Sequence, residues 1–221
     1  MPEKTVVCLS GGIDSTVLLA RALYEDRVCY ALSFEYGQRH AERELEAARA
    51  ITKFYGIAHQ ILELSKTVFH GPSALLVDAT HDIPNGHYTD QVQRATVCPA
   101  RNMVLLSCAA AYAINLQCTS IAYAAHSGDH AIYPDCRPAF VLAMADTLLR
   151  CHYDPITLWT PWLFKYKDEI VTIGDSLHAP FELTYSCYRG GVKHCGRCGT
   201  CVERKEAFQL AKVPDPTEYE A

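Results

Sequence analysis

The stretch from residue 5 to residue 19 constrains the fold more than any other part of this sequence. An apolar run over residues 5–9 is typical of a buried strand, Ser10, Gly11 and Gly12 interrupt it, and residues 16–23 carry apolar side chains at helical spacing. A strand, a glycine-rich turn and a helix in this order present backbone N–H groups and the positive end of a helix dipole to an anion. The stretch therefore predicts a βα unit whose turn binds phosphate.

Asp14 is unusual in such a turn because it adds negative charge beside the expected phosphate. Its position is explained if it caps the helix or holds a metal ion that bridges to the phosphates. The Walker lysine and the GxGxxG pattern are both absent. Residues 10–15 instead resemble the SGGxDS signature of the PP-loop ATP pyrophosphatases, which split ATP between its α and β phosphates and adenylate a substrate; an ordinary βα turn is the alternative.

Composition narrows the class of protein. The chain has 221 residues and 49% hydrophobic content, which suits one domain with a substantial core. The net charge is −5 and no basic tail is present, so direct nucleic-acid binding is not indicated. No apolar run approaches the ~18 residues of a membrane span, and no signal-like segment opens the chain. We therefore expect a soluble, cytoplasmic protein that acts on small molecules.

Strand-like and helix-like segments alternate along the chain, which predicts an α/β protein with a Rossmann-like, doubly wound parallel sheet. We expect one domain over residues 1–221, with ligands bound beyond the carboxyl ends of the strands. The segment 65–97 lacks periodicity and is expected to be a lid or a disordered loop. The predicted strands span residues 4–9, 28–34, 59–64, 118–124 and 156–158, and the predicted helices span residues 14–24, 41–55, 103–114, 138–150 and 167–174.

Polar residues gather where these strands end. Residues 35–40 follow the second strand and residues 126–138 follow the fourth. Arg101 lies in the first turn of a helix, where a positive charge is unfavourable because it opposes the helix dipole. This position indicates that Arg101 binds an anion. Cys136 has no predicted base beside it, so a packed thiol is a simpler interpretation than a nucleophile.

Four of the eleven cysteines lie close together near the C-terminus with the spacing Cys187-x7-Cys195-x2-Cys198-x2-Cys201. Glycines between them allow the thiolates to converge. Four thiolates suit a tetrahedral Zn²⁺ with bonds of ~2.3 Å, and a closed four-sulfur shell is structural. An iron–sulfur cluster is the alternative metal, although the Cys-Pro that ends a ferredoxin motif is absent. We expect segment 185–204 to bind one zinc and to support the active-site loops.

Taken in order, five motifs make the chain similar to the 7-cyano-7-deazaguanine synthase family of the queuosine pathway, from Val6 to about Arg204. They are residues 10–15, residues 36–40, Pro99-x-Arg101-Asn102, residues 133–137 and the cysteine cluster. The resemblance implies an adenine nucleotide alpha hydrolase-like fold and a carbon–nitrogen ligase. Enzymes of this family convert 7-carboxy-7-deazaguanine and ammonia to the nitrile through an acyl adenylate, an amide and an adenylated amide, with ATP and Mg²⁺. A homodimer is the family expectation.

The resemblance also assigns residues to roles. Asp14, Arg101 and Lys167 are expected to be catalytic, and Arg101 and Asn102 are expected near the phosphates or the substrate carboxylate. Position 98, usually Val in the family, is Cys98, and position 100, often Gly, is Ala100; we expect both to be tolerated. The ATP-binding residues would be Leu9, Ser10, Gly11, Gly12, Ile13, Asp14, Ser15, Thr16, Val17, Leu18 and Leu19, and the substrate-binding residues Tyr36, Gln38, Arg39, Asn102, Asp129, Asp135 and Arg137.

Three other functions stay open. The reaction can stop at the amide, as for deazaguanine modification of DNA, and the motifs do not separate this product from the nitrile. Another PP-loop enzyme, such as a tRNA-thiolating or lysidine-forming one, would need a basic RNA-binding surface, which the net charge of −5 does not favour. A zinc-ribbon binding module would bind ATP without turnover, against which the intact sequence of residues 10–15 argues.

Overall fold

A computed structural model describes residues 2–65, 67–87 and 91–220 of the chain, and its centre is a sheet of five parallel strands in the order β3-β2-β1-β4-β5. The chain adds β2 and β3 on one side of β1, then crosses to add β4 and β5 on the other side. This is the doubly wound arrangement that the sequence predicts. The strands are β1 (Lys4–Cys8), β2 (Val28–Glu35), β3 (Ala58–Glu63), β4 (Ser120–Ala122) and β5 (Thr157–Trp159).

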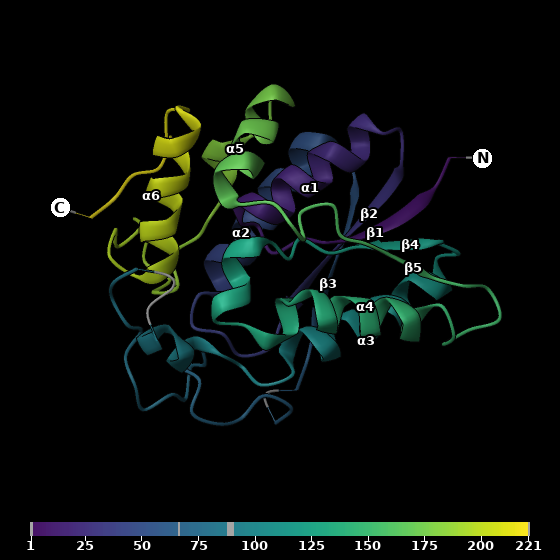
Figure 1. Ribbon diagram of the computed structural model, residues 1–221, viewed down its shortest axis with the longest axis horizontal. Coiled ribbons are helices and arrows are strands. Elements are labelled where there is room, and N and C mark those ends of the chain that lie inside the picture. Colours follow the sequence, from purple (N-terminus) through teal and green to yellow (C-terminus); the bar gives the residue numbers. More distant parts are fainter. Residues whose placement is uncertain (1, 66, 88–90, 221) are drawn as a thin grey trace.

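Helices cover both faces of this sheet, with α1 and α5 on one side and α3 and α4 on the other (Figure 1). Every predicted helix is present with ends shifted by a few residues. The helices are α1 (Ile13–Tyr24), α2 (Ala41–Tyr55), α3 (Arg101–Asn115), α4 (Pro138–Leu148), α5 (Lys167–Ser176) and α6 (Gly199–Ala211), with 3-10 turns at Gln91–Thr96, Ser127–Ala131, Pro134–Cys136 and Phe181–Leu183.

Two hydrophobic cores form because neighbouring residues of a strand point to opposite faces. Val7 packs with the helices α1, α2, α5 and α6, whereas Val6 packs with α3 and α4. The same division separates Ala31 from Leu32 in β2. Burial on both faces explains why these strands are continuous apolar runs.

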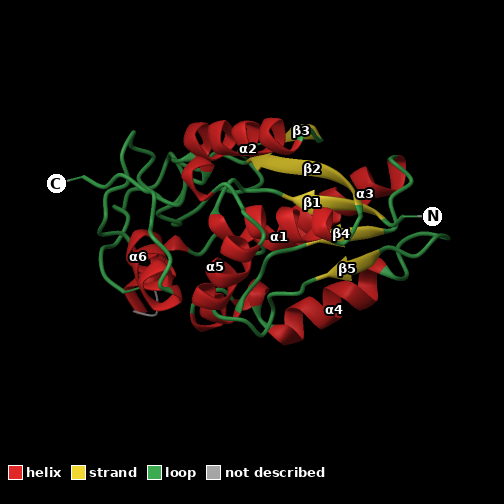
Figure 2. Cartoon of the chain, turned by 90° about the horizontal axis from the view of Figure 1, so that it is seen from above, coloured by secondary structure: helices red, strands yellow, loops and turns green. Residues whose placement is uncertain are grey.

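The helix α6 is absent from the sequence-based prediction, and the structure corrects that omission. Its buried face comprises Thr200, Cys201, Arg204, Ala207 and Phe208, which follow helical spacing. A buried arginine and a metal-ligand cysteine occupy positions where a hydrophobic residue normally marks the period, so the periodicity was hidden. Helix α6 packs beside α5, on the same side of the molecule as the chain's C-terminal end (Figure 2).

The long segment 65–97 is anchored to the rest of the molecule wherever it is described. Arg39 donates hydrogen bonds to the carbonyl oxygens of Leu76, Ala79 and His81. At its other end the N–H of Gly86 donates to the carbonyl of Arg197, in the cysteine-rich segment, at 3.1 Å. The disordered alternative is therefore wrong for residues 65, 67–87 and 91–97, whereas residues 66 and 88–90 lie outside the described part. The single-domain prediction, residues 1–221, also includes residues 1 and 221, which lie outside it.

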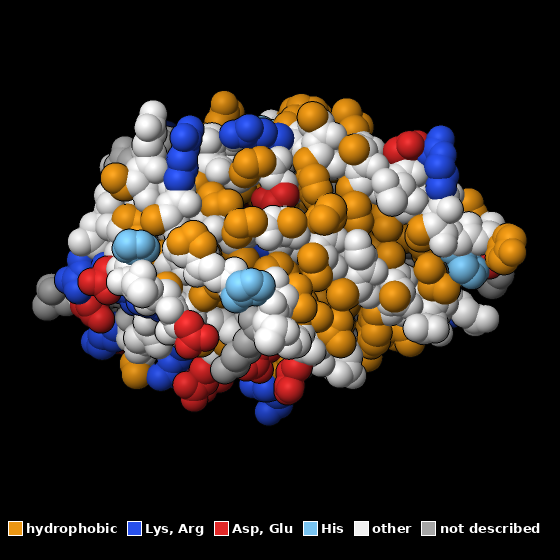
Figure 3. Space-filling model, turned by 90° about the horizontal axis from the view of Figure 1, so that it is seen from below, with side chains coloured by type: hydrophobic (Ala, Val, Ile, Leu, Met, Phe, Trp, Pro, Cys, Tyr) orange, Lys and Arg blue, Asp and Glu red, His pale blue; other side chains and the backbone are white. Residues whose placement is uncertain are grey.

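Exposed apolar side chains gather on the side of the molecule that carries α3 and α4 (Figure 3). Met103 on α3 and Leu142 on α4 are 48% and 67% exposed. Among the described residues, no helix combines the length and apolar character needed to cross a bilayer.

Gly11 fixes the close approach of the loop after β1 to α2. Its φ is +84°, and a Cβ there would meet the Glu44 carbonyl oxygen at 2.6 Å. We expect Gly11→Ala to cost at least about 2 kcal/mol, from the left-handed backbone and the clash together. At 2–4 °C per kcal/mol this lowers the melting temperature by about 4–8 °C.

Gly56, at the end of α2, is the matched control. It also has a positive φ, +67°, but nothing lies within 4 Å of its added Cβ. Gly56→Ala is therefore expected to cost only about 1 kcal/mol. Equal melting temperatures for the two variants, by calorimetry, would contradict the close packing of the loop against α2.

Candidate active site

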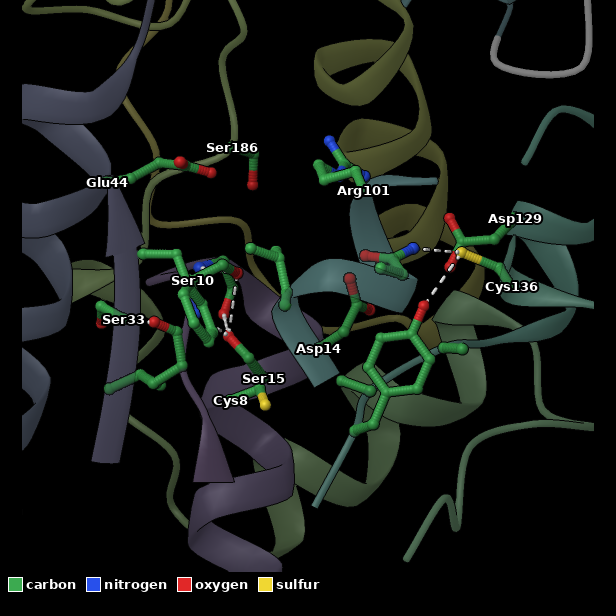
Figure 4. Close-up of a pocket in the computed structure, with 18 of the residues that line it drawn as sticks. Cys8, Ser10, Asp14, Ser15, Ser33, Glu44, Arg101, Asp129, Cys136 and Ser186 are labelled. Atoms are coloured by element: carbon green, nitrogen blue, oxygen red, sulfur yellow. Dashed lines mark hydrogen bonds between the residues drawn. The ribbon is translucent and has the colours of Figure 1, made fainter. Parts of the chain in front are cut away.

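A cavity of ≈ 240 Å³ opens at the carboxyl ends of the strands, where parallel α/β sheets bind ligands (Figure 4). It lies between β1 and β4, where the strand order reverses because the chain stops adding strands on one side of β1 and begins on the other. The predicted residues that line it are Leu9, Ser10, Gly12, Ile13, Asp14, Ser15, Tyr36, Arg101, Asn102, Asp129 and Lys167. The structure thus gathers predicted residues from five separate parts of the chain into one site.

The conformation of the loop after β1 is stabilised by hydroxyl groups of its own residues. The Ser15 hydroxyl lies 3.1 Å from that of Ser10 and accepts a hydrogen bond from the Ser10 N–H at 3.2 Å. Gly12 is the N-cap of α1, and no side chain caps it. The backbone N–H groups at the start of α1 are therefore available to an anion. Asp14 does not cap the helix, so that interpretation of this residue is wrong.

The Asp14 carboxylate instead forms an ion pair inside the cavity. Its Oδ2 lies 3.2 Å from Lys167 Nζ, and Lys167 Nζ lies 2.5 Å from Glu203 Oε2. Burial alone would raise the pKa of Asp14, but the charges of Lys167 and His126 outweigh it and hold the pKa below its usual value. Burial likewise opposes the charged form of Lys167, and its carboxylate neighbours still raise its pKa. Asp14 and Lys167 are therefore both ionised near neutral pH.

His126 completes this acidic corner of the cavity. The ring is 1% exposed, and its Nδ1 accepts a hydrogen bond from the Gly128 N–H. In the neutral ring the proton therefore lies on Nε2, which faces Asp129 Oδ2 at 3.6 Å and Asp14 Oδ2 at 3.8 Å. The ring separates the two carboxylates and helps to fix their positions.

Arg101 lies in a different environment, among tyrosines. It donates a hydrogen bond to Tyr36 Oη at 3.1 Å, and its guanidinium carbon lies 5.9 Å from the Tyr36 ring centre and 5.8 Å from that of Tyr133. Within residues 2–65, 67–87 and 91–220, no carboxylate lies within ion-pair distance of Arg101. Because guanidinium stays charged and matches carboxylate or phosphate in pairs of hydrogen bonds, this arrangement suits an anionic ligand.

Cys136 also lines the cavity, but its environment does not activate it. Its Sγ lies 3.3 Å from Tyr123 Oη and 3.4 Å from Asn102 Nδ2. Burial raises the pKa of this thiol well above its usual value. The protonated thiol fits the predicted packing role.

Four predicted substrate-binding residues do not line the cavity. Gln38 binds backbone and Glu44, and Arg39 anchors segment 65–97. Asp135 Oδ2 accepts the Asn102 N–H at the start of α3, and Arg137 donates to the His130 carbonyl. In this structure these side chains make contacts within the protein, outside the cavity lining. Of the predicted ATP-binding residues, those that do not line the cavity are buried: Gly11, Thr16, Val17, Leu18 and Leu19.

Several residues that line the cavity or contact its lining were not predicted from the sequence. Glu203 lies two residues beyond Cys201, in the helix that the prediction omitted. His126 belongs to a polar cluster that the sequence analysis noted without giving it a role. Glu44, Tyr185 and Ser186 also line the cavity. The position of Glu203 close to the last cysteine was the available signal, since residues close to metal ligands are held in place by the metal site.

The four cysteines converge as their spacing predicts. Their sulfur atoms all lie within 4.8 Å of one another, and all four residues are buried. Hydrogen bonds from Cys187 and Cys201 lower the pKa of Cys198, as expected where a thiolate is stabilised. The donor set and its burial fit a tetrahedral four-sulfur metal site. It is the one such group of metal-ligating side chains among the described residues.

This cysteine centre is connected to the active site by short contacts. The Tyr185 N–H donates to the Gly11 carbonyl at 2.9 Å. Arg204, fully buried in α6, donates to the Ser186 hydroxyl at 3.1 Å and pairs with Asp215 at 3.2 Å. Glu203 holds Lys167. The metal segment therefore braces both the phosphate loop and the active-site lysine.

A doubly wound sheet with the Ser-Gly-Gly-x-Asp-Ser loop at its first strand places the chain among the PP-loop adenine-nucleotide enzymes. A solved 4-thiouridine synthetase in complex with RNA and bound ATP shares this fold, with a TM-score of 0.52 and 16% identity, over 95% of this chain and 50% of that one. The sequence matches the family model described as "Queuosine biosynthesis protein QueC" over residues 4–212, and the chain belongs to this family.

Curated relatives agree with this assignment. The 7-cyano-7-deazaguanine synthase of Pseudoalteromonas translucida is 44% identical over 221 residues and covers both chains completely. That of Caldicellulosiruptor saccharolyticus is 46% identical over 98% of this chain and 96% of the relative. The chain is therefore an ATP-dependent enzyme.

Removing one cysteine should destabilise the C-terminal segment that contains the metal site. We expect Cys198→Ser to lose its metal, measured by atomic emission, and at least about 3 kcal/mol of stability, a part of the ~10–16 kcal/mol that structural zinc supplies in small domains. One zinc per chain is expected in the wild type; iron would support the cluster alternative. Cys151→Ser, at an exposed cysteine outside the centre, should change neither quantity. An unchanged melting temperature in metal-free Cys198→Ser would contradict a structural role.

Proposed function

We propose that this enzyme converts 7-carboxy-7-deazaguanine and ammonia to 7-cyano-7-deazaguanine at the expense of two ATP, each cleaved to AMP and pyrophosphate. The observation that carries the proposal is the cavity itself. It brings a phosphate-type loop at the start of α1 together with Arg101, a half-buried guanidinium with no described carboxylate within ion-pair distance. A nucleotide and a second, anionic substrate are the two ligands that such a cavity suits. The names of the curated relatives supply the product, 7-cyano-7-deazaguanine.

In the first stage, the loop at residues 10–15 binds the leaving β and γ phosphates, and Arg101 orients the substrate carboxylate. A carboxylate oxygen attacks the α phosphorus, the bond to the β-phosphate oxygen breaks, and pyrophosphate leaves with the electron pair. Lys167, held between Asp14 and Glu203, offers a positive charge for the phosphates. Ammonia then attacks the acyl carbon, AMP leaves, and one proton is released with formation of the amide.

In the second stage, the amide oxygen attacks the α phosphorus of a second ATP and displaces pyrophosphate. The nitrogen loses one proton as the adenylated amide forms; loss of its second proton and departure of AMP with the carbon–oxygen electron pair leave the nitrile. Both stages activate an oxygen on the same carbon, so one cavity serves both. The Asp129 carboxylate, 3.6 Å from His126 Nε2, is placed to take up a proton.

Two metals are part of this proposal. Asp14 Oδ1 is buried and has no hydrogen-bond partner among the described residues, which fits a carboxylate that shares Mg²⁺ with the phosphates. Bound there, Mg²⁺ would neutralise charge that develops on the triphosphate. Cys187, Cys195, Cys198 and Cys201 would hold a structural zinc with a closed shell of ligands.

We also propose that the enzyme is a homodimer located in the cytoplasm. The exposed apolar side chains on α3 and α4 support an interface on that side of the molecule. Neither a nucleic acid nor a membrane is part of the proposed reaction.

Mass spectrometry of the products tests the reaction. Purified protein with ATP, Mg²⁺, ammonium and 7-carboxy-7-deazaguanine should yield the nitrile, with two AMP for each nitrile formed. Accumulation of the amide with one AMP would support the truncated reaction instead. Absence of AMP formation would contradict the proposed substrate.

Asp14→Ala tests the acidic residue of the loop. We expect AMP formation to fall at least about 100-fold, since the variant loses a charged partner of the phosphate site. The circular dichroism spectrum should be unchanged, because the Asp14 side chain caps no helix. Asp154→Ala, at a side chain that is 97% exposed, is the control and should keep full activity. Wild-type AMP output from folded Asp14→Ala would refute the role of Asp14.

A further inference from the structure

Glu44 is a cavity residue to which the reaction above gives no role. It lies in α2 on the wall beside the phosphate loop, and its side chain is 21% exposed. In the view of Figure 4, Glu44 and Arg101 lie on either side of Ser186 at one edge of the cavity, away from Cys8 and Ser33. A carboxylate in this position meets whatever extends from Arg101 across the cavity.

Two buried side chains hold this carboxylate in place. Gln38 Nε2 donates to Glu44 Oε2 at 3.2 Å, and His40 Nε2 lies 3.5 Å from Glu44 Oε1. Gln38 and His40 are only 2% and 3% exposed. Burial lowers the pKa of His40, so its ring is neutral near pH 7 and brings no compensating charge. The carboxylate is thus oriented by two side chains that carry no positive charge.

The oriented carboxylate retains capacity for further hydrogen bonds. Each oxygen has two acceptor positions, and one hydrogen-bonding group inside the protein faces each of them. The remaining two positions suit a ligand that offers two N–H donors side by side. A guanine-type ring has such a pair, in its N1–H and its exocyclic 2-amino group. Adenine presents an unprotonated N1 next to its amino group, which a carboxylate repels.

We propose that Glu44 recognises the N1–H and 2-amino edge of the deazaguanine ring and so determines the enzyme's preference for a guanine-type substrate. The inference rests on the proposed function, because it takes the ring from the proposed substrate. The carboxyl group at position 7 projects from the opposite side of the ring, so Arg101 binds one end of the substrate and Glu44 the other. Gln38 and His40 act through Glu44 as positioning residues.

The test compares two substrates in two proteins. The substrates are 7-carboxy-7-deazaguanine and its analogue without the 2-amino group, and the proteins are the wild type and Glu44→Ala. Steady-state AMP release gives kcat and KM for the acid and KM for ATP. Loss of a hydrogen bond to a charged acceptor lowers kcat/KM by about 10- to 100-fold. We expect this loss on deletion of the amino group, on truncation of Glu44, and only once when both changes are combined.

Glu44→Gln provides a second variant with the same shape, should Glu44→Ala be poorly folded. It should raise KM for the acid by about 10-fold or more and leave KM for ATP unchanged. Glu42→Gln, on the exposed face of the same helix, is the matched control and should behave as the wild type.

The results separate the inference from the function on which it rests. If the wild type forms AMP with the acid but the two deletions multiply, or if KM for ATP rises in place of KM for the acid, the assignment of Glu44 is wrong and the reaction stands. If the wild type forms no AMP with this acid, the proposed function itself fails and takes the inference with it.

Discussion

The ammonium group of Lys167 is the point at which the ends of this chain meet. It lies between Asp14, at the start of the first helix, and Glu203, in the last. An ammonium ion removed from water is costly unless carboxylates surround it, so each element contributes to the stability of the other two. Because Glu203 and Cys201 both lie in α6, this helix connects the metal centre to the cavity. The position of this lysine depends on the whole C-terminal segment.

The features that the sequence predicted correctly are those with a local cause. Apolar runs locate the sheet and helical patterns locate five of the six helices. The turn residues 10–12 locate the phosphate loop, and the cysteine spacing locates the metal centre. What was missed depends on contacts between distant segments. Helix α6 buries Arg204 at a position where a hydrophobic residue normally reveals the helical period. The role of Glu203 depends on its contact with Lys167, which lies 36 residues away in the chain.

The polar residues after β2 show a further limit of the sequence. Gln38 and Arg39 follow the end of a strand, and the resemblance assigned both to substrate binding. In the structure Gln38 faces inward to Glu44, and Arg39 reaches across to the carbonyl of Ala79. Position along the chain identifies the edge of the sheet but not the direction of a side chain, and this direction depends on the packing of segment 65–97. Ala100 shows the same limit. Its φ of +57° is a conformation that favours glycine, and only the structure reveals it.

The contact from Tyr185 to Gly11 has a consequence for synthesis of the chain. The phosphate loop leaves the ribosome first. Tyr185, whose N–H binds the loop carbonyl, follows about 170 residues later, and Glu203, which pairs with Lys167, follows about 190 residues later. At about 5–20 residues per second these intervals are about 10–40 s. During that time the nascent chain carries a nucleotide-binding turn without its brace. An incomplete or metal-free chain therefore lacks an assembled site. Such a chain is not expected to consume ATP.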